Sequence, residues 1–310
     1  MLFPVVRCFS IILLLWAWLP GGFAQTVQTL QWPTRYAAKP PANIDARWLS
    51  AFRLGLASIS EAQAVGMSGT AAQVMGLPQE QAGRLQKLLV PLYEEMKQDA
   101  VFKGARSTLL YCYSEATPTN GLATVYFPEK LDTNLPPIVF LHGYGGSFLW
   151  PIHLLVKTFP ERVIIAPAYG LSGGNMHPLY LQQALRATQE ALKLEEPLPK
   201  PVLIGLSAGV AKVLEIYGPR AVQYTGAICI AGYPPSELLP AYRTGHKVEF
   251  LCGEAEIFVQ NQMLTKSIEK MKARGVQVNS QLLAKADHFF MAEFPEESMT
   301  RLKLAMSRLR

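Results

Sequence analysis

The 310-residue sequence is poor in cysteine. Its four cysteines, Cys8, Cys112, Cys229 and Cys252, form no CxxC pair and no cluster with histidine at metal-ligand spacing. The sequence therefore predicts no metal site. Cys229 and Cys252 fall on strands expected to be neighbours, so one disulfide is geometrically conceivable, but buried free thiols are the favoured interpretation.

Long runs of one charge are also absent. Charged residues make up 17% of the chain and its formal net charge is +6, but the basic residues are scattered, with no run of five or six and no aromatic-basic platform. This argues against a nucleic-acid partner and leaves a mild attraction to anionic surfaces. Walker and Rossmann patterns are missing too, so we expect no nucleotide or organic cofactor.

Residues 1–24 differ in composition from the rest. Arg7 is their only charge, and the apolar run at 9–19 is too short to span a bilayer. Gly22 and Ala24 place small residues at positions −3 and −1 of a cut before Gln25. We expect a cleaved secretory signal peptide, a secreted or periplasmic protein, and no stable membrane span after cleavage. The alternative is an uncleaved membrane anchor.

The most informative motif is Gly-Leu-Ser-Ala-Gly at 205–209. It follows the apolar run 201–204 and opens a stretch with a helical pattern. A serine on a sharp turn from strand to helix requires very small neighbours two residues away on either side, which gives Gly205 and Gly209 a steric reason. Taken alone, the pentapeptide would also suit a glycine-rich helix N-terminus.

Two other segments support the first interpretation. The apolar run 137–141 is typical of a strand buried on both faces, and it ends in His-Gly-Tyr-Gly-Gly at 142–146, a loop able to offer free N–H groups. Late in the chain, 276–283 reads as a last strand, and Asp287-His288 follows on a loop before a terminal helix.

With these three motifs in this order, the chain resembles the α/β-hydrolase family, in particular its serine esterases and lipases, over residues 107–310. The resemblance implies an α/β fold: an eight-stranded, mostly parallel sheet with helices on both faces, and a nucleophile after the fifth strand. Short β-rich runs alternate with longer helical patterns, as in right-handed βαβ crossovers. The strands are expected at 137–141, 162–166, 201–205, 225–230 and 247–252, and the helices near 147–158, 177–194, 208–217 and 259–274.

Ser207 is the expected nucleophile, and a serine hydroxyl needs an adjacent base to accept its proton. Of the five histidines, His288 is the predicted base because imidazole transfers protons near neutral pH and because of its position. His142 belongs to the glycine loop and is expected to be structural. The remaining three are expected to be capping or surface residues.

The acid that orients the imidazole is less sharply defined. In the resembling family an acid, usually Asp, stands three residues after a glycine in the loop that follows the strand at 247–252. Position 256 stands three residues after Gly253 and carries glutamate in place of aspartate. As the candidate acid, Glu256 is ranked first, Glu254 second and Glu237 third. Asp287 is expected to point away from His288.

The resemblance also implies an oxyanion hole built from two backbone N–H groups, those of Ala208 and Tyr144, with Gly143 and Gly145 as alternatives to the latter. The loops expected at the carboxyl edge of the sheet carry many aromatic residues, which predicts an apolar pocket for an uncharged substrate. Its principal residues are Tyr144, Phe148, Tyr233 and Phe289, accompanied by Trp150, Tyr169, Met176 and Phe290.

Residues 25–106 precede the expected catalytic domain. The stretch 25–43 reads as an irregular lead, and 48–59 and 82–96 show helical spacing. We interpret 25–106 as a helical extension packed on the core; a cap over the site is the alternative.

Residues 107–113 and 122–127 read as an antiparallel hairpin at the sheet edge.

These inferences predict a serine carboxylesterase that acts on a small uncharged ester through an acyl-enzyme. A serine peptidase or amidase with the same residues is the second hypothesis. The third is a catalytically silent binding protein on the same fold.

Overall fold

A computed structural model describes residues 25–40, 45–67, 79–171, 176–257 and 261–310. The expected signal peptide, residues 1–24, lies outside the described residues. Within the described ranges, no helix combines the length and the apolar character needed to cross a membrane.

One eight-stranded sheet organises the described chain, in the order β1-β2-β4-β3-β5-β6-β7-β8. β2 runs antiparallel to β1 and β4, and the other neighbouring strands are parallel. This confirms the expected mostly parallel sheet. The strands are β1 (Thr26–Pro33), β2 (Asn120–Phe127), β3 (Ile138–Leu141), β4 (Ile164–Ala168), β5 (Val202–Leu206), β6 (Gly226–Ile230), β7 (Lys247–Gly253) and β8 (Gln277–Leu283).

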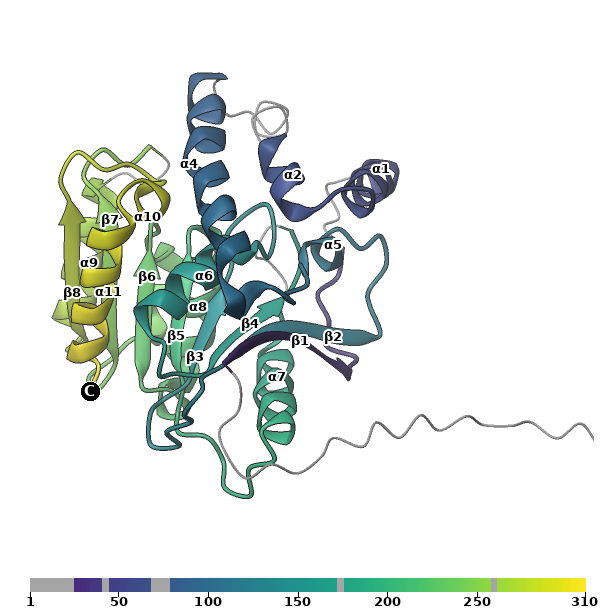
Figure 1. Cartoon of the computed structure of the whole chain (residues 1–310). Coiled ribbons are helices and arrows are strands. Elements are labelled where there is room, and N and C mark those ends of the chain that lie inside the picture. Colours follow the sequence, from purple (N-terminus) through teal and green to yellow (C-terminus); the bar gives the residue numbers. More distant parts are fainter. Residues whose placement is uncertain (1–24, 41–44, 68–78, 172–175, 258–260) are drawn as a thin grey trace, which may run out of the picture.

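Helices cover both faces of the sheet (Figure 1). Successive residues of a strand point to opposite faces, so Val139 faces one apolar core and Phe140 the other. The first core is closed by α7 (Pro178–Ala191), α8 (Ala208–Arg220) and α9 (Asn261–Ala273), and the second by α4 (Gln79–Gln98), α6 (Leu149–Thr158), α10 (Phe290–Glu293) and α11 (Pro295–Arg308). Short 3₁₀ helices are η1 (Ala100–Phe102), η2 (Ala221–Gln223) and η3 (Ser236–Ala241).

The first edge strand differs from the expectation. β1 comes from residues 26–33, within the stretch interpreted as an irregular lead, and pairs with β2 over its whole length. Val27 and Trp32 are its buried apolar side chains. The extension therefore contributes a strand to the sheet as well as helices.

The prediction of a strand at 107–113 is wrong. This segment contains a one-turn helix, α5 (Leu109–Cys112). The Ser107 hydroxyl accepts a hydrogen bond from Leu109 N–H, at the start of α5, at 3.2 Å. Leu109 and Cys112 are both buried, and their spacing of three residues suits one face of a helical turn. An apolar run that resembles a strand in sequence therefore forms one turn of helix, with Leu109 and Cys112 buried.

Among the described residues, the α-helices that precede this point are α1 (Ala46–Ala57), α2 (Glu61–Gly66) and α4. α4 buries Leu92 and Tyr93 in the second core. Glu61 of α2 accepts a hydrogen bond from Leu149 N–H, in the first turn of α6, at 2.6 Å and others from Tyr93 and Ser107. Burial raises the pKa of this carboxyl group. Negative charge at a helix N-terminus is favourable. The contact of Glu61 with the first turn of α6 therefore stabilises the packing of α2 on the core.

Cys112, Cys229 and Cys252 are free and buried, as expected. Cys8 lies outside the described residues.

Candidate active site

Ser207 occupies a strained turn between β5 and α8. Its backbone has φ 54° and ψ −119°, a conformation that is unusual for a residue with a side chain. The flanking glycines are sterically required: a Cβ atom on Gly205 would lie 2.7 Å from the carbonyl oxygen of Gly209, and one on Gly209 would lie 2.3 Å from that of Leu141. The turn therefore presents the hydroxyl of Ser207 at the carboxyl end of β5.

The structure brings Ser207, His288 and Glu256 together. His288 Nε2 lies 2.9 Å from Ser207 Oγ, and His288 Nδ1 lies 2.6 Å from Glu256 Oε1. The side chain of His288 is 10% exposed and that of Glu256 is fully buried. With Nδ1–H donating to the carboxylate, Nε2 is left as the acceptor for the serine proton.

The turn after β7 and the loop after β8 pack against each other, which explains how Glu256 reaches His288. Ala255 N–H donates to the carbonyl of Ala286 at 2.8 Å. A Cβ atom on Gly253 would lie 2.2 Å from the same carbonyl oxygen, so this glycine permits the close approach.

The other two candidate acids lie elsewhere. Glu254 Oε2 accepts a hydrogen bond from Lys285 N–H at 3.2 Å, and Glu237 lies in η3 beside Ser236. Asp287 pairs with Arg84 of α4 and accepts a hydrogen bond from Phe289 N–H. Its carboxylate is thus directed away from the imidazole, as expected.

The glycine loop at 142–146 lies against the serine. A Cβ atom on Gly143 would be 3.1 Å from Ser207 Cβ. Ala208 is the first residue of α8, where backbone N–H groups have no acceptor within the helix. Gly145 N–H donates to the carbonyl of Leu171 at 3.1 Å, which engages it outside the site. Tyr144 and Gly143 remain as candidates for the second donor.

Sheet order and site now define the fold. The second strand of an otherwise largely parallel eight-stranded sheet is antiparallel, and a strained serine follows the fifth strand. The chain has the α/β-hydrolase fold.

No family model matches the chain, and no curated protein matches it. Solved structures are similar at low identity. A Bacillus cereus carboxylesterase aligns at 16% identity over 63% of this chain and 99% of its own, with a TM-score of 0.46. An S-formylglutathione hydrolase from Agrobacterium tumefaciens aligns at 14% identity over 62% and 91%, with a TM-score of 0.48. A predicted CIB-like hydrolase from Thermoplasma acidophilum aligns at 16% identity over 61% and 93%, with a TM-score of 0.47.

In this α/β-hydrolase fold, His142 supports the glycine loop from behind. Its Nδ1 donates to the carbonyl of Gly143 at 2.8 Å, and its ring stacks on Tyr169 with centroids 3.9 Å apart. Tyr169 N–H faces Nε2 at 3.4 Å, and the Tyr169 hydroxyl donates to the carbonyl of His142 at 2.6 Å. Burial lowers the pKa of His142 to about 4, so the ring is neutral at pH 7.

Sequence reasoning missed two supports of the site. The Tyr113 hydroxyl donates to the carbonyl of Gly145 at 2.9 Å, and Arg84 pairs with the aspartate next to His288. An apolar run that ends in tyrosine, or an arginine on an amphipathic helix, carries no signal of such a contact.

The expected pocket residues are divided between the surface and the core. Tyr144 is 51% exposed, and the ring of Phe289 stands edge-on to His288 with centroids 5.5 Å apart. Phe148 caps α6 and Tyr233 packs on the first core, both half-buried. Trp150 is half-buried too, whereas Tyr169, Met176 and Phe290 are buried in the core and are not available to line a pocket.

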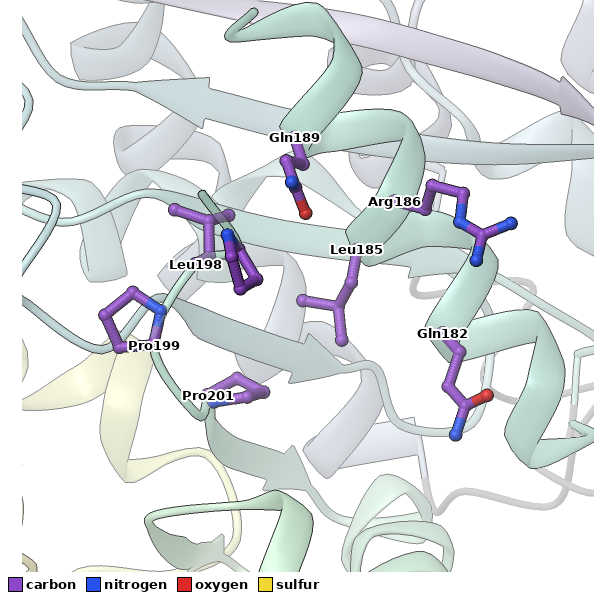
Figure 2. A pocket seen from close by; sticks show the side chains of 8 residues that line it. Gln182, Leu185, Arg186, Gln189, Leu198, Pro199 and Pro201 are labelled. Atoms are coloured by element: carbon purple, nitrogen blue, oxygen red, sulfur yellow. The ribbon is translucent and has the colours of Figure 1, made fainter. Parts of the chain in front are cut away.

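A separate hollow lies at the opposite end of β5, between α7 and the segment 197–201 (Figure 2). Pro201 directly precedes β5, whereas Ser207 directly follows it. The hollow therefore lies at the other end of the strand from Ser207. Among the described residues, no group of three or more His, Cys, Asp or Glu side chains is arranged to hold a metal ion.

Proposed function

We propose that the protein is a secreted serine hydrolase that cleaves carboxylic esters through an acyl-enzyme. The observation that carries the proposal is the continuous contact from Ser207 Oγ through the His288 imidazole to the Glu256 carboxylate. Three residues from separate loops meet in the order that nucleophilic catalysis requires.

In the first half-reaction, Ser207 Oγ attacks the ester carbonyl carbon while His288 Nε2 accepts the serine proton. The Glu256 carboxylate accepts a hydrogen bond from Nδ1–H and stabilises the imidazolium that forms. The tetrahedral intermediate collapses as the C–O bond to the alcohol breaks, and the alcohol leaves with the proton from His288. In the second half-reaction, His288 deprotonates a water that attacks the acyl-enzyme, which releases the acid and restores Ser207.

Negative charge develops on the carbonyl oxygen in each tetrahedral state. The N–H groups of Ala208 and Tyr144 are assigned to this oxygen, because Ala208 begins α8 and the glycine loop lies beside Ser207. Preorganised donors of this kind contribute about 3 kcal/mol each to lowering the barrier.

A small, uncharged ester is the proposed substrate. Exposed Tyr144 and half-buried Phe148, Tyr233 and Phe289 are assigned to its apolar contacts. Hydrolysis of short p-nitrophenyl esters is expected to exceed that of matched p-nitroanilides. Faster turnover of the anilides would favour a peptidase or amidase, and no turnover with no serine adduct would favour a binding protein.

Secretion is part of the proposal and rests on residues 1–24. N-terminal sequencing of the protein exported from an expressing cell is expected to begin at Gln25. A retained N-terminus in a membrane fraction would indicate an uncleaved anchor instead.

A further inference from the structure

The segment that carries His288 is contacted at both ends by one side chain from the N-terminal helices. Arg84 Nη1 pairs with Asp287, which directly precedes the histidine, and Arg84 Nη2 pairs with Glu293, the last residue of α10. The segment 287–293 is thus spanned by a single guanidinium. Figure 1 shows α4 beside α10.

On the carboxylate side the ion pair is shielded from solvent, whereas the Arg84 side chain is 37% exposed. The Asp287 side chain is 10% exposed, and its Oδ1 accepts a hydrogen bond from Phe289 N–H at 2.9 Å. The carboxylate therefore joins Arg84 to the backbone just after His288. Charge-assisted hydrogen bonds of this kind are among the stronger polar contacts in proteins.

The residue just before the segment, Ala286, contacts the turn that carries Glu256. Ala255 N–H donates to the carbonyl of Ala286, and Gly253 lies against it. The residues on either side of His288 are thus contacted both by this turn, at Ala286, and by α4, at Asp287 and Glu293.

α4 is itself fixed to the core, so Arg84 has a defined position. Leu89, Leu92 and Tyr93 of this helix are buried in the second core. A second ion pair joins α4 to α6, between Glu95 and Lys157 at 2.7 Å. This pair ties the same helix to the core but does not involve the histidine segment.

We propose that Arg84 is a positioning residue for catalysis: through Asp287 and Glu293 it holds the 287–293 segment so that His288 Nε2 stays within reach of Ser207 Oγ. The inference rests on the proposed function. It gives the N-terminal helices a role in the reaction although they supply none of the reacting groups. Without Arg84, a nearly buried carboxylate next to the imidazole loses its cation, and the segment is free to shift. A small displacement of a reacting group costs orders of magnitude in rate.

The test compares Arg84→Met, Arg84→Lys and Lys157→Met with the wild type, using p-nitrophenyl butyrate. Arg84→Met is expected to lower kcat about tenfold and leave KM within about twofold, since Tyr144, Phe148 and Tyr233, three of the four assigned substrate contacts, lie outside the 287–293 segment. Arg84→Lys retains the charge but has one ammonium in place of the two guanidinium nitrogens that span the segment, so its kcat is expected to lie between those of Arg84→Met and the wild type. Lys157→Met removes the matched ion pair of α4 and is expected to change kcat by less than about twofold.

Thermal unfolding of each variant separates positioning from loss of fold, and Arg84→Lys keeps the test decisive if Arg84→Met does not fold. Equal losses of kcat in Arg84→Met and Lys157→Met would overturn the proposal, because they would show that the pair only docks α4. A rise in KM at constant kcat would overturn it too. If the wild type reacts with a fluorophosphonate but hydrolyses no ester, the same variants are compared by their rates of labelling. If the wild type neither labels nor hydrolyses an ester, the proposed function is refuted, and the role of Arg84 with it.

Discussion

Ser207 is held by the backbone of its own strand and helix, whereas His288 is held by side chains and turns from distant parts of the chain. At the serine, Gly205 and Gly209 allow β5 and α8 to meet in a turn where a Cβ atom at either glycine would clash with backbone, that of Gly209 or that of Leu141. At the histidine, Glu256 contacts the ring, and Arg84 forms ion pairs with Asp287 and Glu293 in the surrounding segment. The contrast shows that one half of the site is encoded locally and the other half by tertiary structure.

The largest expected effect is on the histidine side. Glu256→Gln removes the negative charge that stabilises the imidazolium, so kcat is expected to fall about 10³-fold with little change in unfolding temperature. Steady-state kinetics on p-nitrophenyl butyrate measure it.

Glu254→Gln is the matched control, since Glu254 lies two residues away and its carboxylate bonds to Lys285 N–H instead of the imidazole. Its kcat is expected to stay within about twofold of the wild type. Equal losses in the two variants would contradict the assignment of Glu256.

On the serine side, the expected effect is on folding. Gly209→Ala places a Cβ atom 2.3 Å from the Leu141 carbonyl oxygen, so the variant is expected to lose about 3 kcal/mol of unfolding free energy. Urea unfolding measures the change. In the control, Gly55→Ala, the Cβ atom meets nothing within 4 Å, and helix propensity is expected to stabilise α1. A Gly209→Ala protein as stable as the wild type would remove the steric argument.

A smaller effect is expected behind the glycine loop. The pKa of His142 is about 4 in the folded protein, below its ordinary value of 6.5, so the unfolded chain binds the proton first as pH falls. Stability is therefore lost between about pH 6.5 and pH 4. Between pH 7.5 and 4.5 the wild type is expected to lose about 2 to 3 kcal/mol more than His142→Asn. Urea unfolding at both pH values checks this, and equal losses would show that His142 is not the group responsible.

The same contrast separates what the sequence predicts from what it does not. The parallel strands are continuous apolar runs, so the segments at 137–141, 201–205 and 225–230 were predictable to within a residue. The turn at 205–209 was predictable because its glycines are neighbours of the serine in sequence. Each of these features depends on residues within a few positions of one another.

The edge strand and the histidine support were not predictable for the opposite reason. β1 pairs with a strand about ninety residues later and lies among prolines that suggest irregular structure. Its partner β2 was predictable at 122–127, but the apolar run at 107–113, which contains α5, resembles the strand that would pair with it. Arg84 and Asp287 are 203 positions apart, and nothing in an exposed amphipathic helix marks one arginine as special.

The central claim is that His288 activates Ser207. Reaction of the folded protein with a fluorophosphonate, followed by peptide mass spectrometry, tests it most directly. We expect one covalent adduct on Ser207 in the wild type, and a strongly reduced rate of labelling in a folded His288→Asn variant. An unlabelled Ser207 in folded wild-type protein, or an undiminished rate in that variant, would contradict the account.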